Sequence, residues 1–121
     1  MKVTVVGAGH VGATAAQRIV EGDIADVYLV DIVEGLATGK ALDMAEAAPI
    51  VGHSCAIEGG TEYGPAAGSD IVVITAGKAR TPGMSRDDLL ASNAQISRPV
   101  VEGVTPFAPT ARILMVPIRL E

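Results

Sequence analysis

Residues 3–12 read Val3-Thr4-Val5-Val6-Gly7-Ala8-Gly9-His10-Val11-Gly12, an apolar run followed at once by a glycine-rich turn. The next apolar run, Val27-Tyr28-Leu29-Val30, ends at the acid Asp31. A strand, three spaced glycines, a helix and an acid about 20 residues further on form the dinucleotide-binding fingerprint. Its first glycine permits the tight turn, its second lets backbone N–H groups approach a pyrophosphate, and its third lets the helix pack on the sheet. We therefore expect the six residues Gly7, Ala8, Gly9, His10, Val11 and Gly12 to bind a dinucleotide.

Asp31 indicates which dinucleotide is bound. A carboxylate at the end of the second strand accepts hydrogen bonds from the ribose hydroxyls of NAD and repels the 2′-phosphate of NADP. The sequence therefore predicts NAD as the cofactor.

The rest of the chain alternates short apolar runs with helical patterns, which predicts a parallel sheet. The polar stretch 59–64 is expected to be a loop, and Pro99 is expected to kink or end the last helix. Right-handed crossovers give a Rossmann-type, doubly wound α/β fold with strand order 3-2-1-4-5 and a ligand crevice beside the first and fourth strands. The expected strands are 2–7, 26–31, 54–58, 70–75 and 112–116, and the expected helices are 10–22, 34–48 and one that starts near Arg86 with Ser85 as its N-cap.

Composition limits the classes of function. The 121 residues suit a single domain, 49% are hydrophobic and only 2% are aromatic, as in a sheet covered by helices. The net charge of −5 argues against nucleic-acid and anionic-membrane partners. Cys55 is the only cysteine, so it gives no disulfide and no metal site, and we expect it to be a small buried residue. With no apolar run of signal-peptide length, a cytoplasmic location is expected.

A second cluster of charge follows the fourth predicted strand. The loop from Thr75 to Arg86 carries Lys78, Arg80 and Arg86 on a hinge that contains Pro82-Gly83. Two guanidinium groups on a closing loop suit a small dicarboxylate, because one can pair with a carboxylate while the other polarises a carbonyl oxygen.

Together with the glycine turn and Asp31, the segments Gly39-Lys40-Ala41-Leu42-Asp43-Met44 and 75–90 closely resemble the NAD-dependent malate dehydrogenases of the lactate-dehydrogenase-like type. The resemblance implies that Arg80 pairs with the distal carboxylate of malate or oxaloacetate, where lactate dehydrogenases carry Gln. It also implies that Arg86 stabilises the developing charge on the carbonyl oxygen and that Asn93 contacts NAD. In the family, the helix that contains Asp43 packs on a neighbouring subunit, so a homo-oligomer is expected.

The chain departs from this family after its last predicted strand. Ile118 stands where the family carries an Asn that contacts substrate and cofactor. The sixth strand and the substrate domain, with the catalytic His and its Asp, have no counterpart here. His10 lacks an orienting acid and His53 is expected to be a solvated surface residue, so neither replaces that base and we expect no turnover. Residues 1–119 are therefore expected to be a truncated NAD-binding domain, with 120–121 a cloning remnant.

Two alternatives stay open. One is a stand-alone NAD-binding module without catalysis, for which Arg80 and Arg86 would have no use. The other is part of a lactate dehydrogenase, where Arg80 would leave an unpaired charge facing the methyl group of lactate.

Overall fold

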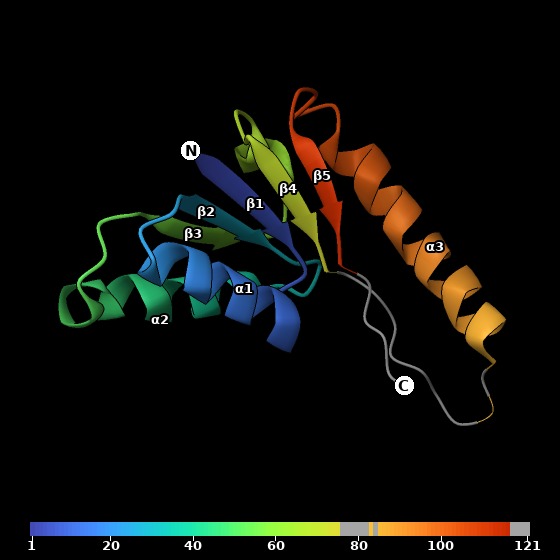
Figure 1. Cartoon of the computed structure of the whole chain (residues 1–121), viewed down its shortest axis with the longest axis horizontal. Helices are drawn as coiled ribbons and strands as arrows, with labels where there is room; N and C mark the ends of the chain where they lie inside the picture. The colour runs from blue at the N-terminus through green and yellow to red at the C-terminus, as the bar shows by residue number, and fades with distance from the viewer. Residues whose placement is uncertain (76–82, 84, 117–121) are drawn as a thin grey trace.

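The computed structural model describes residues 1–75, 83 and 85–116, with the backbone alone for 86, 89, 90, 92 and 93. Within these residues, five strands form one parallel sheet in the order β3-β2-β1-β4-β5 (Figure 1). This confirms the predicted order. The strands are β1 (Lys2–Val6), β2 (Asp26–Val30), β3 (Ile57–Gly60), β4 (Ile71–Ile74) and β5 (Arg112–Met115), and the helices are α1 (His10–Glu21), α2 (Leu36–Val51), the 3₁₀ turn η1 (Gly64–Ala66) and α3 (Arg86–Val104).

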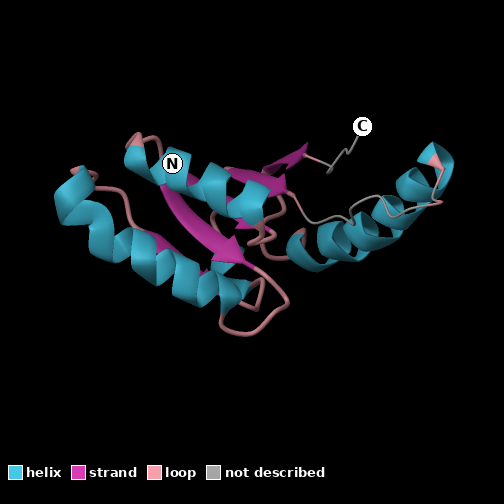
Figure 2. Ribbon diagram, turned by 90° about the horizontal axis from the view of Figure 1, so that it is seen from below, coloured by secondary structure: helices cyan, strands magenta, loops and turns pink. Residues whose placement is uncertain are grey.

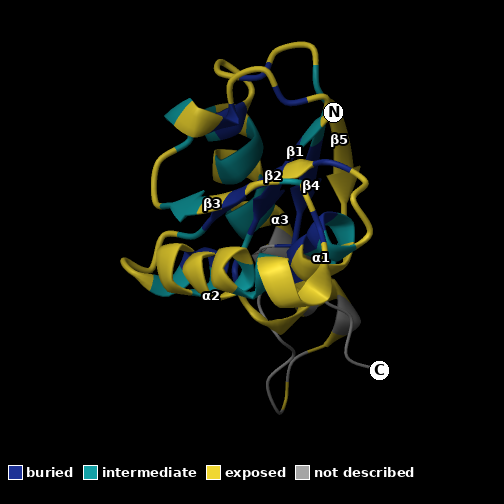
Figure 3. Ribbon diagram, turned by 90° about the vertical axis from the view of Figure 1, so that its left-hand side faces the viewer, coloured by how far each residue is buried: buried dark blue, intermediate teal, exposed yellow. Residues whose placement is uncertain are grey.

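The sheet is covered on both faces, as the fold class requires. Helices α1 and α2 lie on one face and α3 lies on the other (Figure 2). The strands are therefore apolar on both sides, with Val5 and Leu29 packed under α1 and α2, and Val6 and Val30 on the face of α3. The buried residues concentrate in the sheet between these layers (Figure 3). None of the described helices combines the length and apolar character needed to cross a bilayer.

Helix α3 begins where the sequence predicts and ends later. The Ser85 hydroxyl accepts the Asp88 N–H at 3.1 Å, and the Asp88 carboxylate accepts the Ser85 N–H at 3.1 Å, which completes a capping box. The hydrogen bond from the Ser85 backbone lowers the pKa of Asp88. The helix continues through Pro99 to Val104, so the expectation that Pro99 could end it is wrong. Loss of one backbone donor is tolerated because Val100, Val101 and Val104 pack on the sheet.

Strand β3 does not match its predicted position. It begins at Ile57 and runs through Gly59 and Gly60, which were expected in a loop. These glycines pair with Leu29 and Val30 of β2. A Cβ on Gly59 would lie 2.3 Å from the carbonyl oxygen of Ala37 in α2. Glycine is therefore required here by the close approach of a helix to a strand, not by a turn.

The connection from α2 to β3 corrects the expectations for His53 and Cys55. His53 is buried, with Nδ1 3.1 Å from the Cys55 carbonyl oxygen, and is not a solvated surface residue. Cys55 is only half-buried. Its burial raises the pKa of its thiol most, and the neighbouring Asp23 carboxylate raises it further. Asp23 has φ 51°. Its carboxylate accepts the N–H groups of Cys55 and Ser54 at 3.0 and 2.7 Å, and these two hydrogen bonds lower its pKa. This cluster lies at the amino end of the sheet, opposite to the glycine turn.

Candidate dinucleotide site

The glycine turn leaves the carboxyl end of β1 in the conformation that the sequence predicts. Gly7 has φ 103°, which side-chain-bearing residues rarely adopt, and its N–H donates to the Val30 carbonyl at 2.8 Å. A Cβ on Gly12 would lie 1.7 Å from the Gly7 carbonyl oxygen and 2.6 Å from Oγ1 of Thr75. Helix α1 can therefore reach the sheet only with glycine at position 12.

Neither backbone conformation nor packing within the protein requires glycine at position 9. It is the N-cap of α1 with φ −71°, and a Cβ built on it meets nothing within 4 Å. No side chain caps this helix, and the first backbone bond of the helix runs from the Ala13 N–H to the Gly9 carbonyl. The preceding N–H groups, Gly9 to Gly12, are the orphan donors of a helix N-terminus. His10 and Val11 expose their side chains beside them.

Asp31 lies directly against this turn. Its Oδ2 accepts the Ala8 N–H at 2.7 Å and its Oδ1 accepts the Val33 N–H at 2.9 Å. These two bonds fix the orientation of the carboxylate and leave lone pairs on both oxygens for further donors.

Sequence reasoning missed two side chains that hold the turn. Lys40 of α2 donates through Nζ to the Ala8 carbonyl at 2.6 Å. The buried Thr75 hydroxyl donates to the carbonyl oxygens of Val6 and Gly7 at 3.0 and 3.2 Å. Strand register could have identified Thr75, since Val6 pairs with Ile74 and the next residues therefore oppose each other. No spacing rule connects Lys40 with Ala8.

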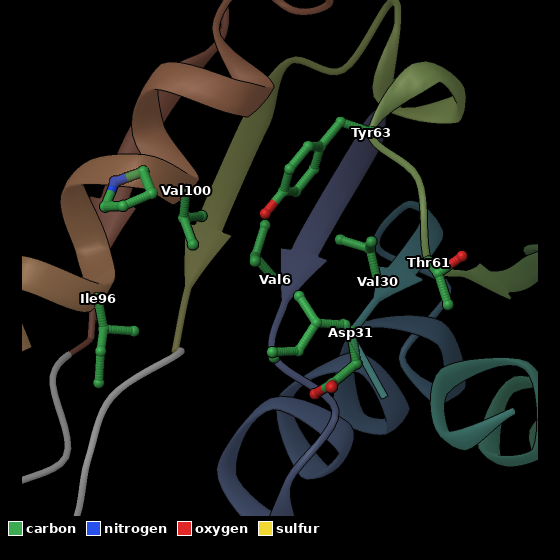
Figure 4. Close-up of a pocket in the computed structure, with 10 residues that line it drawn as sticks. Val6, Val30, Asp31, Thr61, Tyr63, Ile96 and Val100 are labelled. Carbon is green, nitrogen blue, oxygen red and sulfur yellow. The ribbon is translucent and has the colours of Figure 1, made fainter. Parts of the chain in front are cut away.

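A pocket of about 370 Å³ opens beside Asp31, between the carboxyl ends of β1 and β2 and the inner side of α3 (Figure 4). Burial in this pocket raises the pKa of the Tyr63 hydroxyl most, and the negative charge of Asp31 raises it further. The sequence placed the ligand crevice beside the first and fourth strands, whereas this pocket lies on the β2 side of β1. Its lining, which includes Thr61 and Tyr63 that sequence reasoning missed, is mostly apolar and consists of Val6, Gly7, Val30, Asp31, Ile32, Thr61, Tyr63, Ile96, Pro99 and Val100.

The predicted substrate residues are only partly covered by the structure. Arg80 lies outside the described residues. Arg86 is the first residue of α3, and Asn93 lies within that helix, so their backbone positions are defined without their side chains. The structure therefore brings Gly7–Gly12 and Asp31 together and leaves the two arginines untested.

These features fit an adenine dinucleotide. Orphan N–H groups suit a diphosphate, a fixed carboxylate suits ribose hydroxyls, and an apolar slot suits a base. Fold and site together define a dinucleotide-binding domain of the Rossmann type. Residues 1–117 match the family model described as lactate/malate dehydrogenase, NAD binding domain, and the chain belongs to that family.

Known relatives agree with this assignment. The chain is 54% identical over 120 residues to a malate dehydrogenase from Thermomicrobium roseum, covering 99% of this chain and 39% of that protein. The apo malate dehydrogenase of Picrophilus torridus superposes with a TM-score of 0.91 at 46% identity, over 96% of this chain and 38% of the other. The malate dehydrogenase of Archaeoglobus fulgidus in complex with NADH superposes with a TM-score of 0.88 at 43% identity. The match covers 97% of this chain and 40% of the other. The chain thus spans about two-fifths of the length of these relatives.

Proposed function

We propose that this chain is the NAD-binding part, residues 1–119, of a malate dehydrogenase, which interconverts malate and oxaloacetate by hydride transfer. The observation that carries the proposal is the position of Asp31, fixed by the Ala8 and Val33 N–H groups between the glycine turn and the apolar pocket. In this proposal the N–H groups of the turn hold the diphosphate, Asp31 holds the adenosine ribose, the pocket holds adenine, and Asn93 adds a contact. Bound NAD supplies the hydride acceptor.

We propose a small dicarboxylate, malate or oxaloacetate, as the substrate. The support is the pair Arg80 and Arg86 in the sequence, together with relatives named malate dehydrogenase at 54% identity. A guanidinium pairs with a carboxylate in a bidentate manner, and Arg80 is the group that we expect to distinguish a dicarboxylate from lactate.

The test is a calorimetric titration of NADH into the folded chain, followed by oxaloacetate or pyruvate added to the NADH-saturated chain. We expect saturable NADH binding and a preference for oxaloacetate over pyruvate. In Arg80→Gln, oxaloacetate affinity should fall at least about tenfold with NADH affinity unchanged, since a charged pair contributes about 1.5–3 kcal/mol.

Each other result contradicts part of the proposal. A folded chain without NADH binding would reject the cofactor role. NADH binding with a preference for pyruvate would favour a lactate dehydrogenase. NADH binding with neither acid would contradict dicarboxylate binding by this chain and leave its NAD-binding role in place.

We also propose that the chain acts as a homo-oligomer in the cytoplasm, without nucleic-acid or membrane partners, as its net charge of −5 suggests. The exposed apolar side chains of the described residues include Ile50 on α2, which is 89% exposed, and Leu114 on the edge strand β5. Such surfaces favour association. Light scattering is expected to give a mass above that of one chain, and a monodisperse monomer would contradict this proposal.

A further inference from the structure

Two charged side chains from different elements hold the buried residue Ala8 of the glycine turn. The Asp31 carboxylate at the end of β2 accepts the Ala8 N–H at 2.7 Å, and the Lys40 ammonium of α2 donates to the Ala8 carbonyl at 2.6 Å. Ala8 is completely buried. The backbone at this point is therefore fixed from both sides by β2 and α2.

The ammonium of Lys40 holds a main-chain carbonyl oxygen, that of Ala8. Holding this long side chain in one conformation costs up to about 2 kcal/mol of entropy. Lys40 is half-buried in a groove between α1 and α2 that also contains the acids Glu21 and Asp43. Among the described residues, however, it forms no ion pair within 4.0 Å, and its ammonium is directed to the turn.

The carbonyl that Lys40 contacts belongs to the same peptide unit as the Gly9 N–H. In a planar trans peptide these two groups point in opposite directions, so the Gly9 N–H is directed away from Lys40. A cation on the carbonyl polarises the unit and makes its N–H a stronger donor. A Cβ on Gly9 meets nothing within 4 Å, so no protein atom packs against the α-carbon of this residue.

We propose that Lys40 is a positioning residue for the dinucleotide diphosphate. It acts through the Ala8 carbonyl, which it holds in place and polarises so that the Gly9 N–H is oriented and strengthened for a phosphate oxygen. The inference rests on the proposed NAD-binding function, and it extends the site to α2, which carries no other residue assigned to the cofactor.

The test compares Lys40→Met and Lys40→Arg with a matched control, Lys2→Met. Lys2 also donates through Nζ to backbone carbonyls, those of Pro65 and Ala67, but at the amino end of the sheet. We expect Lys40→Met to weaken NADH binding about fivefold, less than the loss of a direct charged hydrogen bond, because Lys40 acts on the phosphate through a peptide unit. Lys40→Arg should recover most of the affinity, and Lys2→Met should bind NADH as the wild type does.

Two further readouts separate positioning from general stability. Adenosine has no diphosphate, so its affinity in an NMR titration should stay within about twofold of wild type in Lys40→Met. In the ligand-free ¹H–¹⁵N spectrum, the Gly9 amide proton should move upfield in Lys40→Met and stay in place in Lys2→Met, because only the first change removes the cation from its peptide unit.

Normal NADH affinity in Lys40→Met, beside normal binding by the wild type, would overturn the role of Lys40 and leave the proposed function intact. Equal losses of NADH and adenosine affinity would overturn it too, because they would indicate a general structural defect. If the wild type itself does not bind NADH, the proposed function fails and the role of Lys40 with it.

Discussion

Gly12→Ala is expected to lower the free energy of unfolding by more than about 3 kcal/mol, a large share of the about 5–15 kcal/mol that stabilises a small domain. Helix propensity alone predicts the opposite, a gain of up to about 1 kcal/mol for Gly→Ala inside a helix. Packing decides the sign here because the new Cβ would lie 1.7 Å from the Gly7 carbonyl oxygen, a backbone atom that cannot rotate away. Chemical denaturation followed by circular dichroism measures the change.

Gly9→Ala is the matched control three residues earlier. Its Cβ meets nothing within 4 Å and its φ of −71° suits any residue, so stability should stay within about 1 kcal/mol of wild type. NADH affinity should nevertheless fall at least about tenfold, because a methyl group would stand where a diphosphate approaches the N–H groups. Wild-type stability in Gly12→Ala would contradict the close packing of α1, and unchanged NADH affinity in Gly9→Ala would contradict the location of the diphosphate.

Asp31→Ala is expected to reduce NADH affinity about 10- to 100-fold, the loss of about one charged hydrogen bond to ribose. NADPH affinity should fall less or rise, because the carboxylate that repels its 2′-phosphate is gone. The ratio of the two dissociation constants, measured by fluorescence titration, is therefore the informative quantity. Part of the NADH loss has a second cause, since the substitution also leaves the N–H of the buried Ala8 without its acceptor.

Asp31→Asn separates charge from geometry. Asparagine keeps the size of the side chain and one acceptor oxygen but has no negative charge. We expect it to relax the preference for NADH over NADPH nearly as much as alanine does, with less loss of stability. If Asp31→Asn discriminates against NADPH as strongly as wild type, the charge of Asp31 is not the determinant of cofactor choice.

Much of the fold could be predicted from local patterns. The alternation of apolar runs and helices gave the sheet order 3-2-1-4-5, and Ser85 marked the start of α3. The errors occurred where distant contacts override local preference. Gly59 and Gly60 look like loop residues but belong to β3, where α2 passes close to Gly59 and the Tyr28 side chain lies close to Gly60. Pro99 does not end α3 because the following turn packs on the sheet.

The candidate site divides in the same way. The sequence by itself determined the glycine turn, the acid that faces it and the family, because one strand, one turn and one helix follow each other in the chain and their spacing carries the chemistry. Only the tertiary structure decided that Thr75 and Lys40 hold that turn and that Tyr63 lines the pocket beside Asp31. These residues come from segments far apart in the sequence, and no periodicity links them. Their contacts exist because parallel crossovers bring the carboxyl ends of the strands to one edge of the sheet.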